Sequence, residues 1–395
     1  MAKEIELANH IDCTGCGACL DACPSKSISF QAEGLHEYPA IADTCIHCGR
    51  CMKVCPILNK KTPEKAFKQN YYCAWNKNAE ERHNSTSGGA GSAMATHARQ
   101  EGYFVCGAGF DGNWHLKHEI TQDKDVIKTF SGSKYLKSDT RGIFSLIKSK
   151  IKQGGRVLFT GTPCQCDAID HVFNEEDRKR IVTVSILCHG VNSPLVWKDY
   201  VAYEESLHNS KLVEYNFRSK SKGWREVEGG GGKLRVLKSF QNGVKKDVPT
   251  WNNIFHCWFG HHYVLRPSCF RCPYRVRQRL SDITIGDFWG LSNVIPGLDT
   301  IEGASVVITS TEKGEAFLHQ CQNMHLIEAD AATTEKVLKG YVEKRTEEKM
   351  ETEIARNKQF ETEYLSKGFA AMAVLYPAET YLQRVLASLK SRLHI

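Results

Sequence analysis

The chain has 395 residues, of which 41% are hydrophobic and 25% charged, and its formal net charge is +7. This length suggests two or three domains, each large enough to bury its own core. There is no run of 18 apolar residues, and the N-terminus MAKEIELANHID has no apolar signal region. We therefore expect a cytoplasmic protein with neither a transmembrane segment nor a secretory signal.

The unusual feature of the composition is its 17 cysteines. In a reducing compartment, clustered cysteines indicate metal ligands rather than disulfides. The net charge of +7 counts every cysteine as neutral. An iron-sulfur cluster on four thiolates carries about two negative charges when oxidised, so three such clusters would bring the balance to about +1. The basic balance therefore predicts no nucleic-acid partner.

Two cysteine sets near the N-terminus share one spacing. CTGCGACLDACP and CIHCGRCMKVCP both fit C-x2-C-x2-C-x3-C-P, and each cysteine of the second lies 32 residues after its counterpart. In such repeats three thiolates of one set bind one cluster, and the fourth reaches the other cluster. We expect two [4Fe-4S] clusters, one on Cys13, Cys16, Cys19 and Cys55 and the other on Cys45, Cys48, Cys51 and Cys23.

Glycines inside these sets suit a backbone folded tightly around inorganic sulfide: Gly15, Gly17 and Gly49. Zinc knuckles are the alternative, but they would need a different cysteine spacing. The segment resembles a bacterial two-cluster ferredoxin. That resemblance implies a module that conducts electrons and has no substrate chemistry of its own.

The rest of the chain divides into a polar linker at 61–69, a large domain at 70–330 and a helical region at 331–395, after a ferredoxin-like domain at 1–60. In the large domain, the strand-like stretches GYFVCGAGF, RVLFTGTPC and IVTVSILCHG alternate with the helical stretches GIFSLIKSKIKQGG and CDAIDHVF. This alternation predicts an α/β domain with a largely parallel sheet. The complete fold is thus a small α+β ferredoxin-like domain followed by an α/β domain and helices.

Two further cysteines follow predicted strands of the large domain. Cys164 comes after RVLFTGTP and Cys188 after IVTVSIL, at the sheet edge where ligands bind in open α/β folds. Cys269 and Cys272 form a CxxC pair between prolines. Together the four would make a third four-thiolate site. From spacing alone, buried structural cysteines, a redox dithiol and half a zinc site remain alternatives.

Six blocks of the large domain resemble the family of coenzyme F420 hydrogenase and dehydrogenase beta subunits, which also includes 7-hydroxymethyl chlorophyll a reductase. In order they are STSGGAGSAM, FSGSKY, GTPCQ, LCHG, LRPSCFRCP and SDITIGDFWG. The resemblance implies a flavin- and [4Fe-4S]-binding domain, with a third cluster on Cys164, Cys188, Cys269 and Cys272. It leaves Cys166 as a bystander and favours FAD rather than FMN as the flavin.

The same resemblance implies the residues of the flavin site. A glycine-rich turn that opens a helix presents free N–H groups to a phosphate or a flavin. The expected flavin contacts are Ser87, Gly88, Gly89, Lys134, Tyr135, Thr160, Gly161 and Thr162.

Two of the residues in these blocks are candidates for catalysis. Lys134 would stabilise a reduced flavin near N1, its alternative being a solvated surface lysine. His189 would donate a proton to substrate, or else hydrogen-bond the backbone around the cluster.

Several features allow two interpretations. Asp282 and Asp287 alternate with apolar residues, and they either orient the cluster loop or cofactor or are exposed carboxylates. Arg275, Arg277 and Arg279 would share one face of an extended strand, as a binding surface for an acidic ferredoxin or anionic substrate, or as a solvated edge.

Two other features have no motif to identify them. The histidine and cysteine cluster at 256–262, which includes Cys257, fits no standard zinc spacing. Near the C-terminus, an apolar stripe would dock on the chain's own core or form a homodimer contact: Leu382, Val385, Leu386, Leu389 and Leu393.

The sequence predicts an iron-sulfur flavoprotein reductase. Electrons from a ferredoxin or similar donor would pass through three [4Fe-4S] clusters to FAD, which would reduce a small organic substrate. The alternative is an electron-transfer subunit that relays electrons between an F420-type deazaflavin or a ferredoxin and a partner enzyme.

Overall fold

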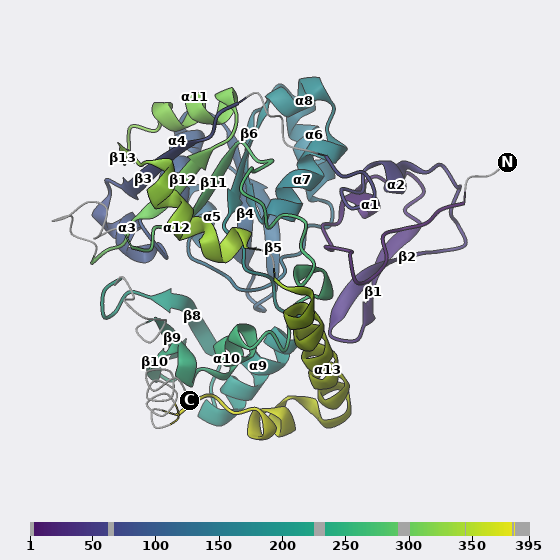
Figure 1. Ribbon diagram of the computed structural model, residues 1–395, viewed down its shortest axis with the longest axis vertical. Helices are drawn as coiled ribbons and strands as arrows, with labels where there is room; N and C mark the ends of the chain where they lie inside the picture. The colour runs from purple at the N-terminus through teal and green to yellow at the C-terminus, as the bar shows by residue number, and fades with distance from the viewer. Residues whose placement is uncertain are drawn as a thin grey trace.

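The structure is a computed structural model that describes residues 4–61, 67–224, 234–290, 301–343, 345–380 and 383. An N-terminal unit packs beside a large sheet with helices around it, and a smaller sheet with its own helices lies below (Figure 1). Within the described ranges every helix is too short or too polar to cross a bilayer. The expected apolar stripe of Leu382, Val385, Leu386, Leu389 and Leu393 lies outside the described residues.

The N-terminal unit repeats its structure as it repeats its sequence. Each cysteine set opens a one-turn helix, α1 (Ala18–Asp21) or α2 (Arg50–Lys53), and between them lies an antiparallel hairpin of β1 (Ile28–Glu33) and β2 (His36–Ile41). Gly17 and Gly49 precede the two helices with φ of 81° and 72°. These left-handed conformations favour glycine, as the sequence predicted.

The large sheet has eight strands in the order β13-β3-β12-β11-β7-β6-β4-β5. Its centre is parallel, because β4 pairs with β6, β6 with β7 and β7 with β11 in that sense. The parallel centre confirms the expected α/β arrangement, but antiparallel strands extend the sheet on both sides. The strands are β3 (Asn70–Asn76), β4 (Phe104–Phe110), β5 (Leu116–Thr121), β6 (Val157–Gly161), β7 (Ile181–Ile186), β11 (Ile283–Asp287), β12 (Ser305–Thr309) and β13 (Met324–Glu328).

Helices pack around this sheet where the amphipathic pattern predicts them. The helix expected in GIFSLIKSKIKQGG is α6, whose buried residues include Phe144, Ile147 and Ile151. The one expected in CDAIDHVF is α7, which begins earlier, at Pro163. The helices are α3 (Ala79–Asn84), α4 (Ala90–Gln100), α5 (Lys124–Thr129), α6 (Ile143–Lys152), α7 (Pro163–Val172), α8 (Glu175–Lys179), α11 (Glu312–Gln320) and α12 (Ala331–Val342).

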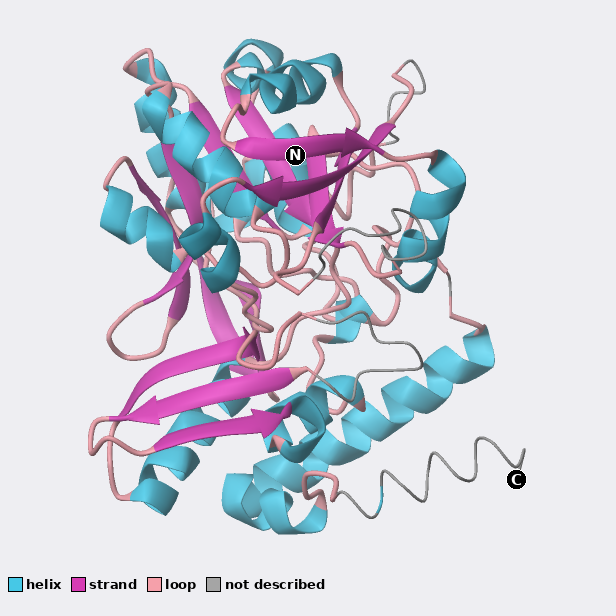
Figure 2. Ribbon diagram, turned by 90° about the vertical axis from the view of Figure 1, so that its left-hand side faces the viewer, coloured by secondary structure: helices cyan, strands magenta, loops and turns pink. Residues whose placement is uncertain are grey.

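A second, antiparallel sheet lies below the large one, with the long helix α13 beside it (Figure 2). Its strands are β8 (Leu212–Ser219), β9 (Arg235–Phe240) and β10 (Lys245–Pro249). The neighbouring helices are α9 (Pro194–His208), η1 (Thr250–Asn252), α10 (Ile254–Gly260), η2 (Pro267–Cys269) and α13 (Glu347–Leu375). Trp197, Tyr200, Phe217, Phe255 and Trp258 fill its aromatic core. The sequence did not predict this sheet.

The N-terminal unit is attached to the large domain by polar and apolar contacts. The carboxylate of Asp21 accepts hydrogen bonds from the N–H groups of Gly142, Phe144 and Ser145 at 2.8, 2.9 and 3.1 Å. It thereby caps α6, whose own N-cap residue is a glycine without a side chain. Ala18 is buried in the same apolar cluster as Phe144. The cysteine loops are therefore held against the large domain.

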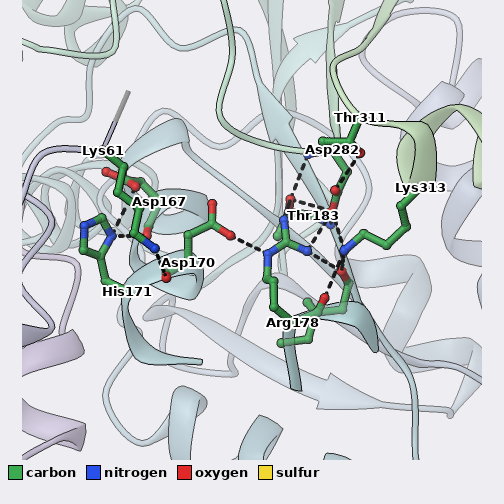
Figure 3. A network of polar contacts seen from close by, with 10 residues as sticks. Lys61, Asp167, Asp170, His171, Arg178, Thr183, Asp282, Thr311 and Lys313 are labelled. Carbon is green, nitrogen blue, oxygen red and sulfur yellow. Dashed lines mark hydrogen bonds and ion pairs between the residues drawn. The ribbon is translucent and has the colours of Figure 1, made fainter. Parts of the chain in front are cut away.

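A buried ionic network centred on Asp282 joins β7, β11, α8 and α11 (Figure 3). Asp282 is 1% exposed and accepts hydrogen bonds from Thr183 N at 2.8 Å, Thr311 Oγ1 at 2.8 Å and Arg178 Nη1 at 3.0 Å. Burial alone would raise the pKa of Asp282, but the cations of Arg178 and Lys313 hold it below its usual value. Asp282 is therefore neither an exposed carboxylate nor a residue of the cluster loop; it stabilises the fold.

Replacing Asp282 by asparagine should destabilise the protein strongly. The substitution keeps the shape but removes the carboxylate that Arg178 and Lys313 share. Arg178 retains Asp170, whereas Lys313 loses its ion pair, and breaking a buried pair costs about 3–5 kcal/mol. Urea denaturation under anoxic conditions would measure this decrease in the free energy of unfolding. Glu176→Gln, which removes an exposed ion pair with Lys179 on α8, is the control and should leave the transition unchanged. Equal behaviour of the two variants would contradict the assignment.

Candidate iron-sulfur and cofactor site

Four cysteines, which we call the first thiol group, surround a small cavity in the N-terminal unit. This cavity has a volume of about 20 Å³ and is lined by Cys13, Cys16, Cys19 and Cys55 together with Gly15 and Gly17. Burial raises the pKa of Cys16 to about 12, and the thiols of Cys13 and Cys55 contribute to the rise. The structure thus brings together three cysteines of the first set and the last cysteine of the second.

The second thiol group combines three cysteines of the second set with Cys23, the last cysteine of the first set. Burial raises the pKa of Cys51, and the nearby thiols of Cys23 and Cys45 raise it further. Cys48 belongs to the same loop and is the one exposed cysteine of the 17. The pKa of Cys19, raised chiefly by burial, also responds to Cys51. The two groups are therefore neighbours, and the second reaches the protein surface.

The third thiol group forms where three distant segments of the large domain meet. Cys164 lies in the first turn of α7, Cys188 follows β7 after one intervening residue, and Cys269 ends η2 with Cys272 three residues later. Burial raises the pKa of Cys188 strongly, and Cys269, Cys164 and Cys272 all add to the rise. A capping box between Thr162 and Gln165 begins α7 and orients Cys164.

The described residues form no site for a single metal ion. Four thiolates around one Zn²⁺ would lie about 3.8 Å apart, given Zn–S distances of about 2.3 Å. Among the described residues, no three His, Cys, Asp or Glu side chains are arranged to hold one ion. None of the 17 cysteines forms a disulfide. In a multi-iron cluster the four thiolates bind different iron atoms, so the cysteines need not converge on one ion.

The remaining five cysteines belong to none of the three groups. Cys166 is 1% exposed and packs in the apolar cluster around Ile147 and Ile169, although it is only two residues from Cys164. The Cys257 thiol donates to the carbonyl of Trp251 at 2.9 Å. The others are buried as well: Cys73, Cys106 and Cys321.

A cavity of about 300 Å³ lies beside the third thiol group, at the carboxyl ends of β6, β7 and β11. This is the edge at which ligands bind in open α/β sheets, and the volume is at the lower end of those of small-molecule sites. Cys188 itself lines the cavity. Most of the expected flavin contacts line it too: Ser87, Gly89, Lys134, Tyr135, Thr160, Gly161 and Thr162, with His189.

Gly88 is the exception among the expected contacts. It does not line the cavity, and a Cβ atom at Gly88 would lie 2.5 Å from the carbonyl oxygen of Ala74 and 2.7 Å from Ser305 N. Glycine is needed here because the turn packs directly against β3 and β12. The Ser87 hydroxyl also points to the backbone, donating to the carbonyl of Ala304.

The turn nevertheless directs a helix N-terminus at the cavity. Gly89 has φ of 81° and provides no side-chain cap for α4. Ala90, Gly91 and Ser92, the first residues of that helix, line the cavity. The N–H groups of an uncapped first turn carry partial positive charge, so this wall favours an anionic group such as a phosphate.

Lys134 and His189 occupy two other parts of the cavity wall. Burial lowers the pKa of Lys134 to about 7, and its Nζ donates to the carbonyls of Ser131 and Gly132 at 2.8 and 3.3 Å. Lys134 is therefore not a fully solvated surface lysine. His189 Nε2 lies 2.7 Å from His262 Nε2, and burial together with the His262 charge lowers the pKa of His189 to about 4. His189 is thus uncharged at neutral pH.

The 256–262 cluster separates in the structure. His262 contacts His189 and lies 3.3 Å from Glu353 on α13. His256 is buried and bonds to the carbonyl of Phe217 at 3.1 Å, whereas His261 is partly exposed beside Glu379. His262 approaches the cavity through His189, and His256 through Tyr135, whose ring centre lies 5.6 Å from its own.

Two residues at the cavity had no signal in the sequence. Arg218 on β8 donates to Tyr135 Oη at 3.1 Å and to Asp287 at 3.2 Å, and its buried Nη2 has no partner among the described residues. His118 on β5 bonds to the carbonyl of Thr160 at 3.0 Å, and its buried Nδ1 is likewise unpaired within the described chain. Both residues come from strands that carry no motif, and both leave a polar atom available to a ligand.

The three arginines after the CxxC pair do not share a face. Arg279 is 6% exposed and donates to the Tyr274 carbonyl at 3.0 Å. Arg275 donates to the carbonyls of Gly340 and Glu343, whereas Arg277 pairs with Glu335 at the surface. Neither alternative, a binding surface on one face or a solvated edge strand, fits these arginines, because the segment is an irregular loop rather than an extended strand.

Comparisons with known proteins match two segments of the chain. Residues 154–335 match the family model for the C terminus of the beta subunit of coenzyme F420 hydrogenase/dehydrogenase, and residues 12–58 match a 4Fe-4S dicluster domain. An uncharacterized protein of Methanocaldococcus jannaschii is 25% identical over 349 residues, which cover 77% of this chain and 85% of that protein.

A relative with a named activity matches over a shorter span. The F subunit of the F(420)H(2) dehydrogenase of Methanosarcina mazei is 22% identical over 198 residues, 47% of this chain and 56% of that relative. The match thus spans about half the length of that relative. A chain of the F420-reducing [NiFe] hydrogenase complex from Methanosarcina barkeri superposes with a TM-score of 0.48 at 18% identity, covering 76% of this chain and 96% of that one.

The resemblance predicted from the sequence blocks is confirmed by these matches. Residues 12–58 are thus similar to a 4Fe-4S dicluster domain, and residues 154–335 are similar to the C terminus of the coenzyme F420 hydrogenase/dehydrogenase beta subunits, to which the chain is related.

Proposed function

We propose that the chain is an electron-transfer subunit in which three [4Fe-4S] clusters connect the protein surface to a flavin in the cavity. We name the clusters after their thiol groups: cluster I on Cys13, Cys16, Cys19 and Cys55; cluster II on Cys23, Cys45, Cys48 and Cys51; cluster III on Cys164, Cys188, Cys269 and Cys272. The observation that carries the proposal is the continuity of these groups. It extends from exposed Cys48 to the cavity wall at Cys188.

The three clusters and the cavity form a row, and neighbouring thiols connect each member of the row to the next. Clusters II and I adjoin because Cys51 is among the thiols that raise the pKa of Cys19 beyond the effect of burial. Clusters I and III adjoin because Cys164 does the same for Cys16. Cys188 then belongs both to cluster III and to the cavity. Electrons can pass from cluster to cluster without a substrate, so the twelve cysteines serve electron transfer alone.

The cavity residues fit a flavin, and FAD rather than FMN follows from the family resemblance. A bound flavin supplies the exchange between single electrons and hydride pairs. The first turn of α4 and Lys134 would hold its anionic groups, while Arg218 Nη2 and His118 Nδ1 offer unpaired polar atoms to the ligand. Neutral His189 beside Cys188 can donate a hydrogen bond, but it is not a charged acid at neutral pH.

The relay is favoured over the self-contained reductase of a small organic substrate. The relative with a named activity is a subunit of an F(420)H(2) dehydrogenase, which supports an F420-type deazaflavin as the hydride partner at the cavity. The reductase would instead require a substrate-specific acid. His189, the residue expected in that role, has its pKa lowered to about 4 by burial and by His262, which leaves Lys134, with a pKa of about 7, as the proton donor in the cavity.

The surface around Cys48 is the expected docking site for the one-electron partner. Ile46 and Leu58 are 61% and 43% exposed on the two sides of the second thiol group. Four basic side chains around this loop are also exposed: Lys26, Arg50, Lys53 and Lys60. An apolar patch with a basic rim complements an acidic carrier such as a ferredoxin, whose approach it would accelerate.

Iron analysis tests the third cluster. The protein purified under anoxic conditions should contain about twelve irons with matching sulfide, because three clusters of four irons are proposed. Cys164→Ser should lose about four irons. Cys166→Ser is the matched control, two residues away on the same helix, and should lose none. Eight irons in the unmodified protein would remove cluster III from the proposal.

Flavin binding should depend on pH through Lys134. The pKa of Lys134 is lowered to about 7 by burial, so the free protein loses this charge above pH 7, whereas a bound anion favours the charged form. FAD affinity of deflavinated protein should therefore fall as pH rises above about 7, by at most about tenfold per pH unit. Fluorescence titration with FAD would measure this dependence.

Lys134→Met should bind FAD more weakly near neutral pH and lose the dependence on pH. Lys128→Met, which removes an exposed lysine of α5, should keep the behaviour of the unmodified protein. Retention of the full pH dependence in Lys134→Met would exclude Lys134 from the flavin site.

Charge reversal tests the docking surface. The double variant Arg50→Glu, Lys53→Glu should slow reduction by an acidic ferredoxin by about tenfold or more at low ionic strength, with little difference at high salt. Stopped-flow spectroscopy of the cluster absorbance would measure the rate. Lys124→Glu on α5 changes charge away from this surface and should have little effect. Equal slowing by both charge changes would indicate a general effect of net charge instead.

A further inference from the structure

Arg266 occupies the boundary between cluster I and cluster III. It is 2% exposed, and its backbone belongs to the third thiol group, because the N–H of Cys269 donates to the Arg266 carbonyl at 2.9 Å. Its side chain belongs to the first group, because Nε donates to the Cys13 carbonyl at 2.7 Å. One residue thus contacts both cysteine loops.

The N-terminal unit is shaped to receive this guanidinium. Nη2 donates to the Glu37 carbonyl at 3.1 Å, and the guanidinium lies 4.5 Å from the centre of the Tyr38 ring. A Cβ atom at Gly15 would lie 3.0 Å from Arg266 Cζ. Gly15 also has φ of +66°, so a side chain at this position would be strained in backbone and in space. The cysteine loop therefore packs its bare backbone against the cation.

The charge of Arg266 has no carboxylate partner within the described part of the chain. Its side-chain hydrogen bonds go to backbone carbonyls, and it forms no ion pair there. Two other buried or half-buried arginines do have one: Arg178 has Asp282 and Arg218 has Asp287. A buried charge without a counter-charge is strongly unfavourable. The negative charge must therefore come from another source.

Lys137 places a second cation at the same boundary. Its Nζ donates to the Ser138 carbonyl at 2.6 Å and, in the described chain, forms no ion pair. Lys137 is half-buried. Its electrostatic neighbours include Arg266, Cys164, Cys16 and the carboxylate of Asp139, so it lies close to both thiol groups, with Asp139 as a neighbour beyond ion-pair distance. Two cations thus converge where two clusters, each anionic when bound to four thiolates, would be nearest.

We propose that Arg266, with Lys137 as its partner, is a positioning residue that holds positive charge between clusters I and III and raises the reduction potential of both. The inference rests on the proposed third cluster. Reduction adds one electron, and hence one negative charge, to a cluster without making or breaking a bond. A nearby buried cation stabilises that added charge, so transfer of an electron from solvent-exposed cluster II to cluster I would become more favourable and its return less favourable.

A redox titration monitored by electron paramagnetic resonance tests this charge directly in the full-length, cluster-loaded protein. Arg266→Gln should move the midpoint potentials of two of the three centres to more negative values and leave the third unchanged. Arg266→Lys keeps the charge and should restore most of the shift. Arg156→Gln is the control, because Arg156 also stacks on a tyrosine and donates to a carbonyl, at Tyr103 and Glu101, but lies outside the thiol groups.

Lys137→Met provides a second variant that leaves every Arg266 contact intact. It should shift the midpoint potentials of the same two clusters in the same direction by a smaller amount. If Arg266→Gln fails to retain its clusters, Lys137→Met alone tests whether the cations raise these potentials. Twelve irons with unchanged potentials in Lys137→Met and Arg266→Gln, or an equal shift of all three centres, would overturn the role of the cations while leaving the three-cluster relay in place. Eight irons in the unmodified protein would instead remove cluster III and both proposals with it.

Discussion

The packing of the first cysteine loop against the large domain is the contact on which the rest of the structure depends. Without it, the N-terminal unit would be a separate module on a polar linker. Asp21 caps α6, Thr140 Oγ1 donates to the Cys16 carbonyl at 2.7 Å, and Arg266 reaches Cys13 from the third thiol group. Each bond uses a backbone group of a cysteine loop or a helix end, so the cysteines themselves remain available to metal.

This contact places the two N-terminal thiol groups in one row with the third thiol group and the cavity. Cysteine spacing alone places clusters I and II beside each other, and sheet topology alone places Cys164 and Cys188 beside the cavity. The docking of the two units brings Cys16 next to Cys164. In the proposed relay, electrons would then move in short steps, from the exposed end at Cys48 to the buried end at the cavity wall.

The large sheet makes the protein rigid around the cavity, where the row of thiol groups ends. Its parallel centre places the ends of β6, β7 and β11 at one edge, and the buried Asp282 network fixes β7 and β11 from the opposite end of the same strands. A cavity lined by backbone turns, such as the Gly89 turn and the Gly161–Thr162 junction, keeps its shape because the strands behind it cannot shift. The small sheet then closes the cavity with Arg218.

Several parts of this description could be predicted from the sequence because they are local. The repeated cysteine spacing determined the two N-terminal thiol groups, and the glycines at 17 and 49 predicted the left-handed turns before α1 and α2. The strands that end near Cys164 and Cys188 followed from continuous apolar runs, which buried parallel strands require. Each of these signals involves residues within a few positions of one another.

Only the tertiary structure decided the roles of the other residues at the site. Asp282 and Asp287 look equivalent in SDITIGDFWG, yet one joins a structural ion network and the other pairs with Arg218 at the cavity. Gly88 and Gly89 are adjacent, but only Gly89 faces the ligand space. Arg218, His118 and Arg266 acquire their roles through partners that are 42 to 253 residues distant. Sequence patterns report the period and spacing of one segment, whereas burial, unpaired polar atoms and uncompensated charge arise only when distant segments pack together.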